Sequence, residues 1–98
     1  METELVNAIN SMNRIELWYD PGSRIVEPHV IGRSSDGNIL LRAYQTEGAS
    51  ESGEHENWKL FRVDRIDSIK TLDERFNSSR PLYNPNDKAM RGGIIARV

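Results

Sequence analysis

The 98-residue sequence contains no cysteine and only two histidines, His29 and His55. Without cysteine, the chain has no disulfide bond, no thiolate nucleophile and no zinc–thiolate site. One histidine is expected in a strand and the other in a loop, which argues against a metal site shared by the two. We therefore predict no metal and no cofactor.

Long apolar runs are also missing, and no stretch is long enough to cross a bilayer. The first residues, Met1–Glu4, are acidic where a secretory signal would be basic. We therefore expect a cytoplasmic protein that has no contact with a membrane, and the lack of cysteine is compatible with a reducing compartment. The formal net charge of -2 disfavours a protein that coats duplex nucleic acid with its whole surface. Any anion site must then be local.

The common catalytic motifs are not found in this sequence. No Gly-x-Ser-x-Gly motif is present, and no glycine-rich loop precedes a helix to cradle phosphates. The segment Asn84–Asp87 lacks the glycine and the final glutamate of a calcium-binding EF-hand loop. Among 15 acidic residues no catalytic carboxylate pair can be singled out. The prediction is that the chain is not an enzyme.

The apolar residues that are present change their spacing near residue 14. Before it, Leu5, Ala8, Ile9 and Met12 recur at helical spacing, which predicts a short amphipathic helix within residues 1–13. After it the apolar period is two, which is typical of half-buried strands. Turn-forming residues then separate five predicted strands: residues 14–19, 24–31, 38–45, 58–63 and 66–72. Pro28 cannot donate to a strand ladder, so the second strand should have an edge or a bulge there.

Five short strands and a leading helix predict a mainly β fold, a small five-stranded SH3-like or Sm-like barrel, because closing the sheet hides its edges. This domain would span residues 1–76, with a flexible acidic loop at 46–57. Residues 77–98 are expected to form an irregular tail with an extra strand at 94–98. The tail would pack across its own barrel or a neighbouring subunit, or act as a basic arm on a phosphate backbone. Burial of the apolar pair Ile94–Ile95 favours packing.

Arginine is the most informative polar residue type here, because its planar fork suits phosphate and carboxylate and stacks on bases. Four arginines lie in or at the ends of predicted strands: Arg24, Arg42, Arg62 and Arg65. Alternation places Arg42 and Tyr44 on one strand face, where they could clamp an anion and stack a base. The alternative for any single arginine is a surface ion pair with Glu27 or Asp64.

The fourth predicted strand sets a geometrical condition on two of these arginines. In a straight strand, Arg62 and Arg65 would point to opposite faces, because their separation is odd. They converge only if the chain bends at Asp64. Aspartate is a good turn residue, and its carboxylate would order the bend or pair with Arg65.

Four segments together resemble the WYL domain in order and spacing: Ile15–Tyr19, Arg24–His29, Leu41–Tyr44 and Leu60–Ile66. The resemblance covers about residues 14–76. The Trp-Tyr-Leu tripeptide that names the family is replaced by Ile39–Leu41. WYL domains usually follow a DNA-binding helix-turn-helix and precede a further domain, and this chain has neither. We therefore expect it to bind or sense without being a transcription factor itself, unless a DNA-reading partner assembles with it.

The resemblance implies an Sm-like barrel that binds a negatively charged ligand, a nucleotide or single-stranded nucleic acid, in bacterial or phage regulation or defence. The ligand-facing residues that it implies are Arg62, Arg65, Arg42, Tyr44, Arg24 and His29. The rival hypothesis is a protein interaction or assembly module, a homo-oligomer in which the same arginines pair with acids across an interface and the tail docks on a neighbour.

Overall fold

The computed structural model describes all residues 1–98 and confirms a mainly β chain with one N-terminal helix. The elements follow the order α1 (Glu2–Ser11), β1 (Asn13–Tyr19), β2 (Gly22–Arg33), β3 (Ile39–Gly48), β4 (Asn57–Arg62), η1 (Val63–Arg65, a 3-10 turn), β5 (Ser68–Arg75) and β6 (Gly93–Arg97). The acidic loop is shorter than predicted, because β3 continues to Gly48 through its pairing with the start of β2.

Helix α1 buries one apolar face made of Leu5, Ala8 and Ile9. It ends at Met12, whose φ of 54° is left-handed and whose N–H reaches the carbonyls of Ala8 and Ile9. Asn13 already belongs to β1, so the helix turns directly into the first strand. No helix in the structure combines the length and the apolar character that a membrane crossing requires.

The strands form one antiparallel sheet whose hydrogen-bonded order is β4-β3-β2-β1-β5, and β6 adds to β2. Strand β2 is long enough to pair with β1 through residues 22–26 and with β6 through residues 30–33. Its register shifts between Pro28 and Val30, so the predicted irregularity at Pro28 is a β-bulge. No ladder joins β4 to β5, the two ends of this order.

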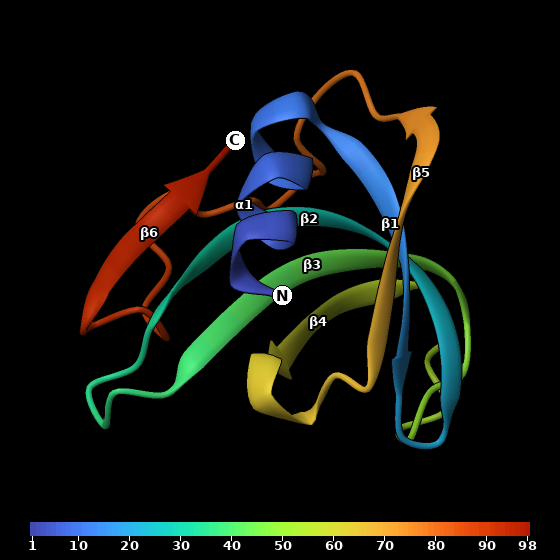
Figure 1. The fold of residues 1–98 in the computed structure, drawn as a ribbon, viewed down its shortest axis with the longest axis horizontal. Coiled ribbons are helices and arrows are strands. Elements are labelled where there is room, and N and C mark those ends of the chain that lie inside the picture. The colour runs from blue at the N-terminus through green and yellow to red at the C-terminus, as the bar shows by residue number, and fades with distance from the viewer.

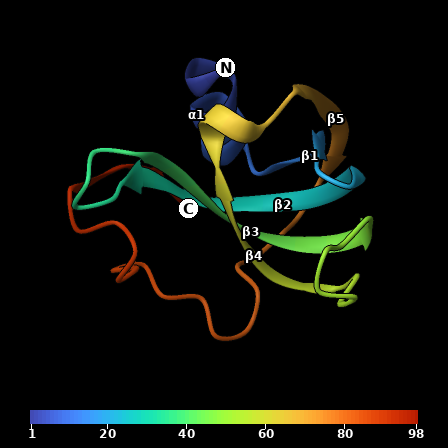
Figure 2. The ribbon, with the colours of Figure 1, turned by 90° about the horizontal axis from the view of Figure 1, so that it is seen from below.

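The curved sheet has two differently covered faces (Figures 1 and 2). The face toward α1, which we call the inner face, packs a cluster of eleven buried residues that includes Leu5, Leu17, Leu41 and Phe61. The opposite side of β2, β3 and β4, the outer face, is crossed by the irregular tail, residues 77–92 (Figure 2). The tail thus packs across its own sheet, and β6 pairs with β2 of the same chain.

A small second apolar cluster attaches the tail to the outer face. It consists of Val30, Leu40 and Met90, with Tyr83, Ala89 and Ile94 packed against it. Gly32 permits this close approach, because a Cβ there would lie 2.7 Å from the Gly93 carbonyl oxygen and 3.0 Å from the Met90 sulfur. The tail is therefore positioned by specific contacts, and it forms one wall of the site described next.

Candidate functional site

Strand register places six side chains on the outer face of β3 and β4. Leu41, Ala43 and Phe61 are buried on the inner face, so their strand neighbours point outward. Leu40 lies opposite Arg62, Arg42 opposite Leu60, and Tyr44 opposite Trp58. Arg42 and Arg62 are thus diagonal neighbours on one face, within reach of a single ligand.

The tail reaches this face at Arg42 and at Trp58. Asp87 accepts two hydrogen bonds from Arg42, at 2.7 Å from Nε to Oδ2 and 3.3 Å from Nη2 to Oδ1. The Trp58 indole N–H donates to the Pro81 carbonyl at 2.9 Å. The Trp58 and Tyr83 rings are nearly parallel, with centroids 6.4 Å apart. Residues 45 positions apart in the sequence therefore meet at one place.

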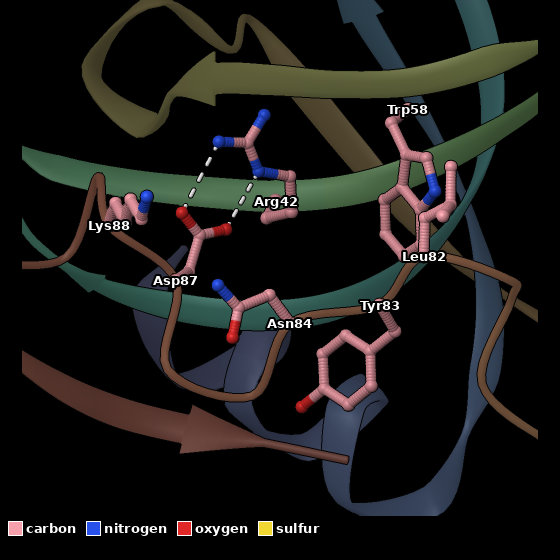
Figure 3. Close-up of a pocket in the computed structure, with 7 residues that line it drawn as sticks. All are labelled: Arg42, Trp58, Leu82, Tyr83, Asn84, Asp87 and Lys88. Atoms are coloured by element: carbon pink, nitrogen blue, oxygen red, sulfur yellow. Dashed lines mark hydrogen bonds and ion pairs between the residues drawn. The ribbon is translucent and has the colours of Figure 1, made fainter.

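Between the tail and the sheet lies a cleft of about 310 Å³. Figure 3 shows Lys88 at one end of it, Trp58 and Leu82 at the other, and the Arg42–Asp87 pair between them. Lys88 is exposed and makes no hydrogen bond or ion pair. The cleft therefore combines two cations with an aromatic surface, a combination suited to a ligand that carries both negative charge and a planar ring.

The acid of this cleft is held in its charged form. Burial raises the pKa of the Asp87 carboxyl, but the hydrogen bonds from Arg42 and from the Ala89 amide outweigh burial, and the pKa lies below its ordinary value. The Asp87 carboxylate thus already occupies the position in which the Arg42 guanidinium could bind a ligand anion. A ligand anion would meet Lys88 first, and it would have to share Arg42 with Asp87.

Arg62 and Arg65 flank the predicted bend, which is the 3-10 turn η1. Asp64 pairs with Arg62, at 2.7 Å from Nη2 to Oδ2, and not with Arg65. Arg62 also contacts Asn38 at 3.4 Å. Arg65 is exposed, makes no ion pair and shares no partner with Arg62. The structure therefore does not link the two arginines through a common group, and their convergence on a ligand stays a prediction.

Arg24, a predicted ligand-facing residue, is buried, with 4% of its surface exposed. Its guanidinium donates to the carbonyls of Tyr19 (3.2 Å) and Asp20 (2.7 Å) and to the Gln45 side chain (3.5 Å). Burial lowers the pKa of Arg24 from its ordinary value. Its position in register directs Arg24 inward, where it braces the turn between β1 and β2. Its contact with a ligand stays a prediction.

His29 is also buried, at 0% exposure. The Arg80 backbone N–H donates to Nε2 at 3.2 Å, so the proton is on Nδ1, which donates to the Glu27 carbonyl at 2.8 Å. Burial lowers the pKa of the ring below its ordinary value. Phe76, Trp58 and Tyr83 surround it. His29 is therefore a packed neutral histidine that supports the aromatic wall of the cleft. Its contact with a ligand stays a prediction.

Tyr44 does lie on the outer face, but its ring is covered. The Arg80 guanidinium sits 4.5 Å from the ring centroid, and the Trp58 ring meets it edge-on at 5.6 Å. Of the predicted residues, the outer face therefore brings together Arg42, Arg62 and Tyr44. Tyr44 supports Trp58 there and does not offer a free ring.

Three residues of the cleft were not among the predicted site residues: Trp58, Asp87 and Lys88. Trp58 stands at the start of a predicted strand, where its position alone did not distinguish it from core packing. Lys88 and Asp87 lie in the tail, and its excess of basic residues was the only feature of the sequence that pointed to an anion-binding role for this segment. Asp87 lies 45 positions from its partner Arg42, so sequence spacing could not reveal the cleft.

Compared with models of protein families, with curated proteins and with solved structures, the chain shows no significant match. In the structure, no group of three or more His, Asp or Glu side chains is arranged to hold a metal ion. The function must therefore be argued from the cleft and its charges.

Proposed function

We propose that this chain is a non-enzymatic module that binds an anionic ligand, a nucleotide or a short single strand of nucleic acid, on the outer face of β3 and β4. The observation that carries the proposal is the cleft in which Arg42 and Lys88 stand beside Trp58. Arg62 lies on the same face, where it is paired with Asp64. The phosphate would contact the cations, and the base would pack on Trp58.

Two features of the cleft favour this ligand class. Arginine and lysine side chains that neutralise nucleic-acid phosphates release the counterions condensed on the strand, which makes the affinity depend on salt. An aromatic ring beside them adds stacking with any base, worth about 1–3 kcal/mol. The WYL resemblance supports the same ligand class, and we include in the proposal that the sheet curled around α1 is an Sm-like barrel.

A charge-reversal pair tests the proposal. Lys88→Glu changes the cleft, whereas Lys70→Glu makes the same change on β5, away from the cleft. Fluorescence anisotropy with labelled single-stranded oligothymidine should show about tenfold or greater loss of affinity for Lys88→Glu and a much smaller loss for Lys70→Glu. Equal losses would mean that only global charge matters, and no binding by the unmodified chain would refute the proposal.

A protein interaction module is the second candidate function, and exposed apolar residues favour it. Leu82 is 93% exposed and lines the cleft, and Leu60, opposite Arg42, is 41% exposed. A homo-oligomer would cover both. Light scattering at low and high salt separates the two candidates, because an apolar assembly resists salt and an electrostatic complex with nucleic acid does not.

A further inference from the structure

A second concave surface lies where β5 leads into the tail. It has a volume of about 360 Å³ and is lined by Arg14, Arg75, Arg80 and the segment Asn77–Ser79. Most of its lining is polar. It has no residue in common with the cleft that contains Arg42 and Lys88, although both use successive parts of the tail.

One buried carboxylate orients two of these arginines. Glu27 is 1% exposed and accepts Arg80 Nε at 2.7 Å, Arg80 Nη2 at 3.1 Å and Arg14 Nε at 3.0 Å. Arg14 also reaches the exposed Glu74 through Nη1 at 3.2 Å. Each guanidinium still has a terminal nitrogen without a partner, Nη1 of Arg80 and Nη2 of Arg14. Both guanidinium groups are therefore held in a fixed orientation and still have N–H donors available to a ligand.

The third arginine has no partner at all. The Arg75 side chain is exposed and makes no hydrogen bond or ion pair with the chain. Three guanidinium groups thus surround a surface whose own lining contributes a single carboxylate, that of Glu27. The local charge is positive in a chain whose net charge is -2.

The backbone adds donors to the same surface. The N–H groups of Asn77, Ser78 and Ser79 have no acceptor in the chain, nor do the side chains of these residues. The segment is nevertheless fixed at both ends, because the Phe76 N–H donates to the Met12 carbonyl at 3.0 Å and the Arg80 N–H to His29 Nε2 at 3.2 Å. Unpaired N–H groups in a segment fixed at both ends are available to an oxyanion.

We propose that Arg14, Arg75, Arg80 and the segment Asn77–Ser79 form a second, separate binding site for a phosphate group. Phosphate is the ligand that matches these donors, because its several oxygens can accept from guanidinium, hydroxyl and backbone N–H groups together. The only large apolar side chain in the lining, Phe76, is buried. The site therefore binds the phosphoryl oxygens and offers no aromatic ring on which a base could stack.

Backbone amide NMR with inorganic phosphate tests the site at constant ionic strength. The amide signals of Asn77, Ser78 and Ser79 should shift in a saturable way, and Arg75→Ala should weaken the binding by about tenfold or more. Arg91→Ala is the matched control, since Arg91 is another exposed arginine whose side chain has no partner and which lines neither cleft, and this variant should bind like the unmodified chain. Lys88→Glu should likewise leave this binding within about twofold, since Lys88 belongs to the other cleft.

Three outcomes would overturn the inference. The amides of Asn77–Ser79 could fail to shift, they could shift equally in the Arg75→Ala variant, or phosphate could shift only amides around Lys88. The last result would leave the proposed function standing while removing the second site. A parallel titration with glycerol phosphate distinguishes the sources of the phosphate: tighter or equal binding shows that the site accepts a phosphoryl group carried on a larger molecule, and loss of binding restricts the site to free phosphate.

Discussion

The inner and outer faces of β2, β3 and β4 are stabilised by different kinds of interaction. On the inner face, Leu41, Ala43 and Phe61 pack under α1 in an apolar cluster. On the outer face, the tail is attached largely by directional contacts, such as the pairs Arg42–Asp87 and Arg80–Glu27. The stabilisation from buried apolar area depends neither on the orientation of the groups nor on pH. The stabilisation from ion pairs depends on both, and a buried histidine makes stability depend on pH.

This difference separates stability from function. The inner face provides most of the apolar burial, so changes there should cost the most free energy of unfolding. The outer face holds the cleft and the charged groups, so it should respond to ligand, salt and pH with smaller energies. Because the tail forms a wall of the cleft, binding and tail packing share the same contacts, with Asp87 on Arg42 as the clearest example.

Adjacent residues on β4 give the sharpest test of the comparison. Phe61 is 1% exposed and points inward, whereas Leu60 is 41% exposed and points outward. Phe61→Ala should lower the free energy of unfolding by about 3–5 kcal/mol, because it removes buried area and leaves a cavity. Leu60→Ala should cost about 1 kcal/mol or less.

Urea denaturation followed by circular dichroism measures both variants. The free energy of unfolding of a small domain is about 5–15 kcal/mol in total. Phe61→Ala should therefore shift the urea midpoint strongly or leave the chain partly unfolded. If the two variants cost the same, the inner face is not the main source of stability and the comparison fails.

The outer face should make the stability of the fold depend on pH, through His29. Burial lowers the pKa of His29 in the folded chain below its ordinary value of 6.5. The unfolded chain therefore takes up a proton at higher pH than the folded one. Stability is fully present above about pH 6.5 and falls as the pH drops toward the folded pKa, by at most about 1.4 kcal/mol per pH unit.

Denaturation between pH 7.5 and 5.5 isolates this effect. Asp87 and Glu27 also have lowered pKa values, so their contributions are lost only in a more acidic window. His55→Gln serves as control, because it changes the other histidine and should retain the slope. A flat profile in the unmodified chain would show that His29 is not held neutral by its surroundings.

The two faces also differ in how far the sequence could predict them. Period-two alternation identified the inner residues of β1 and β3, since a buried apolar face imposes that spacing. The bulge at Pro28 followed from a missing N–H. Alternation also explains the burial of Arg24: it shares the inward face with Val26, and only the structure shows how its guanidinium is satisfied there.

The cleft was beyond such reasoning because it is assembled from distant residues. Arg42 and Asp87 are 45 positions apart, and Glu27 and Arg80 are 53 apart. No local period or motif relates such pairs. The sequence did predict an arginine-bearing strand face and a basic tail, but it did not predict that the tail would occupy that face.

The smallest expected effect concerns the residue where the tail turns beside Trp58. Leu82 has a φ of 72°, in the left-handed region, and its side chain is 93% exposed. A left-handed leucine costs about 1–2 kcal/mol, whereas asparagine tolerates this conformation better. Leu82→Asn should therefore raise the free energy of unfolding by about 0.5–1 kcal/mol, measured as a higher melting temperature.

Leu60→Asn is the matched control, since Leu60 is an exposed leucine in an ordinary strand conformation and should gain nothing from the change. If Leu82→Asn lowers stability instead, the leucine contributes more by packing at the cleft than it costs in backbone strain. Retention of a strained, exposed leucine would then indicate that the cleft selects an apolar group at this position, which favours a ligand or partner with an apolar surface.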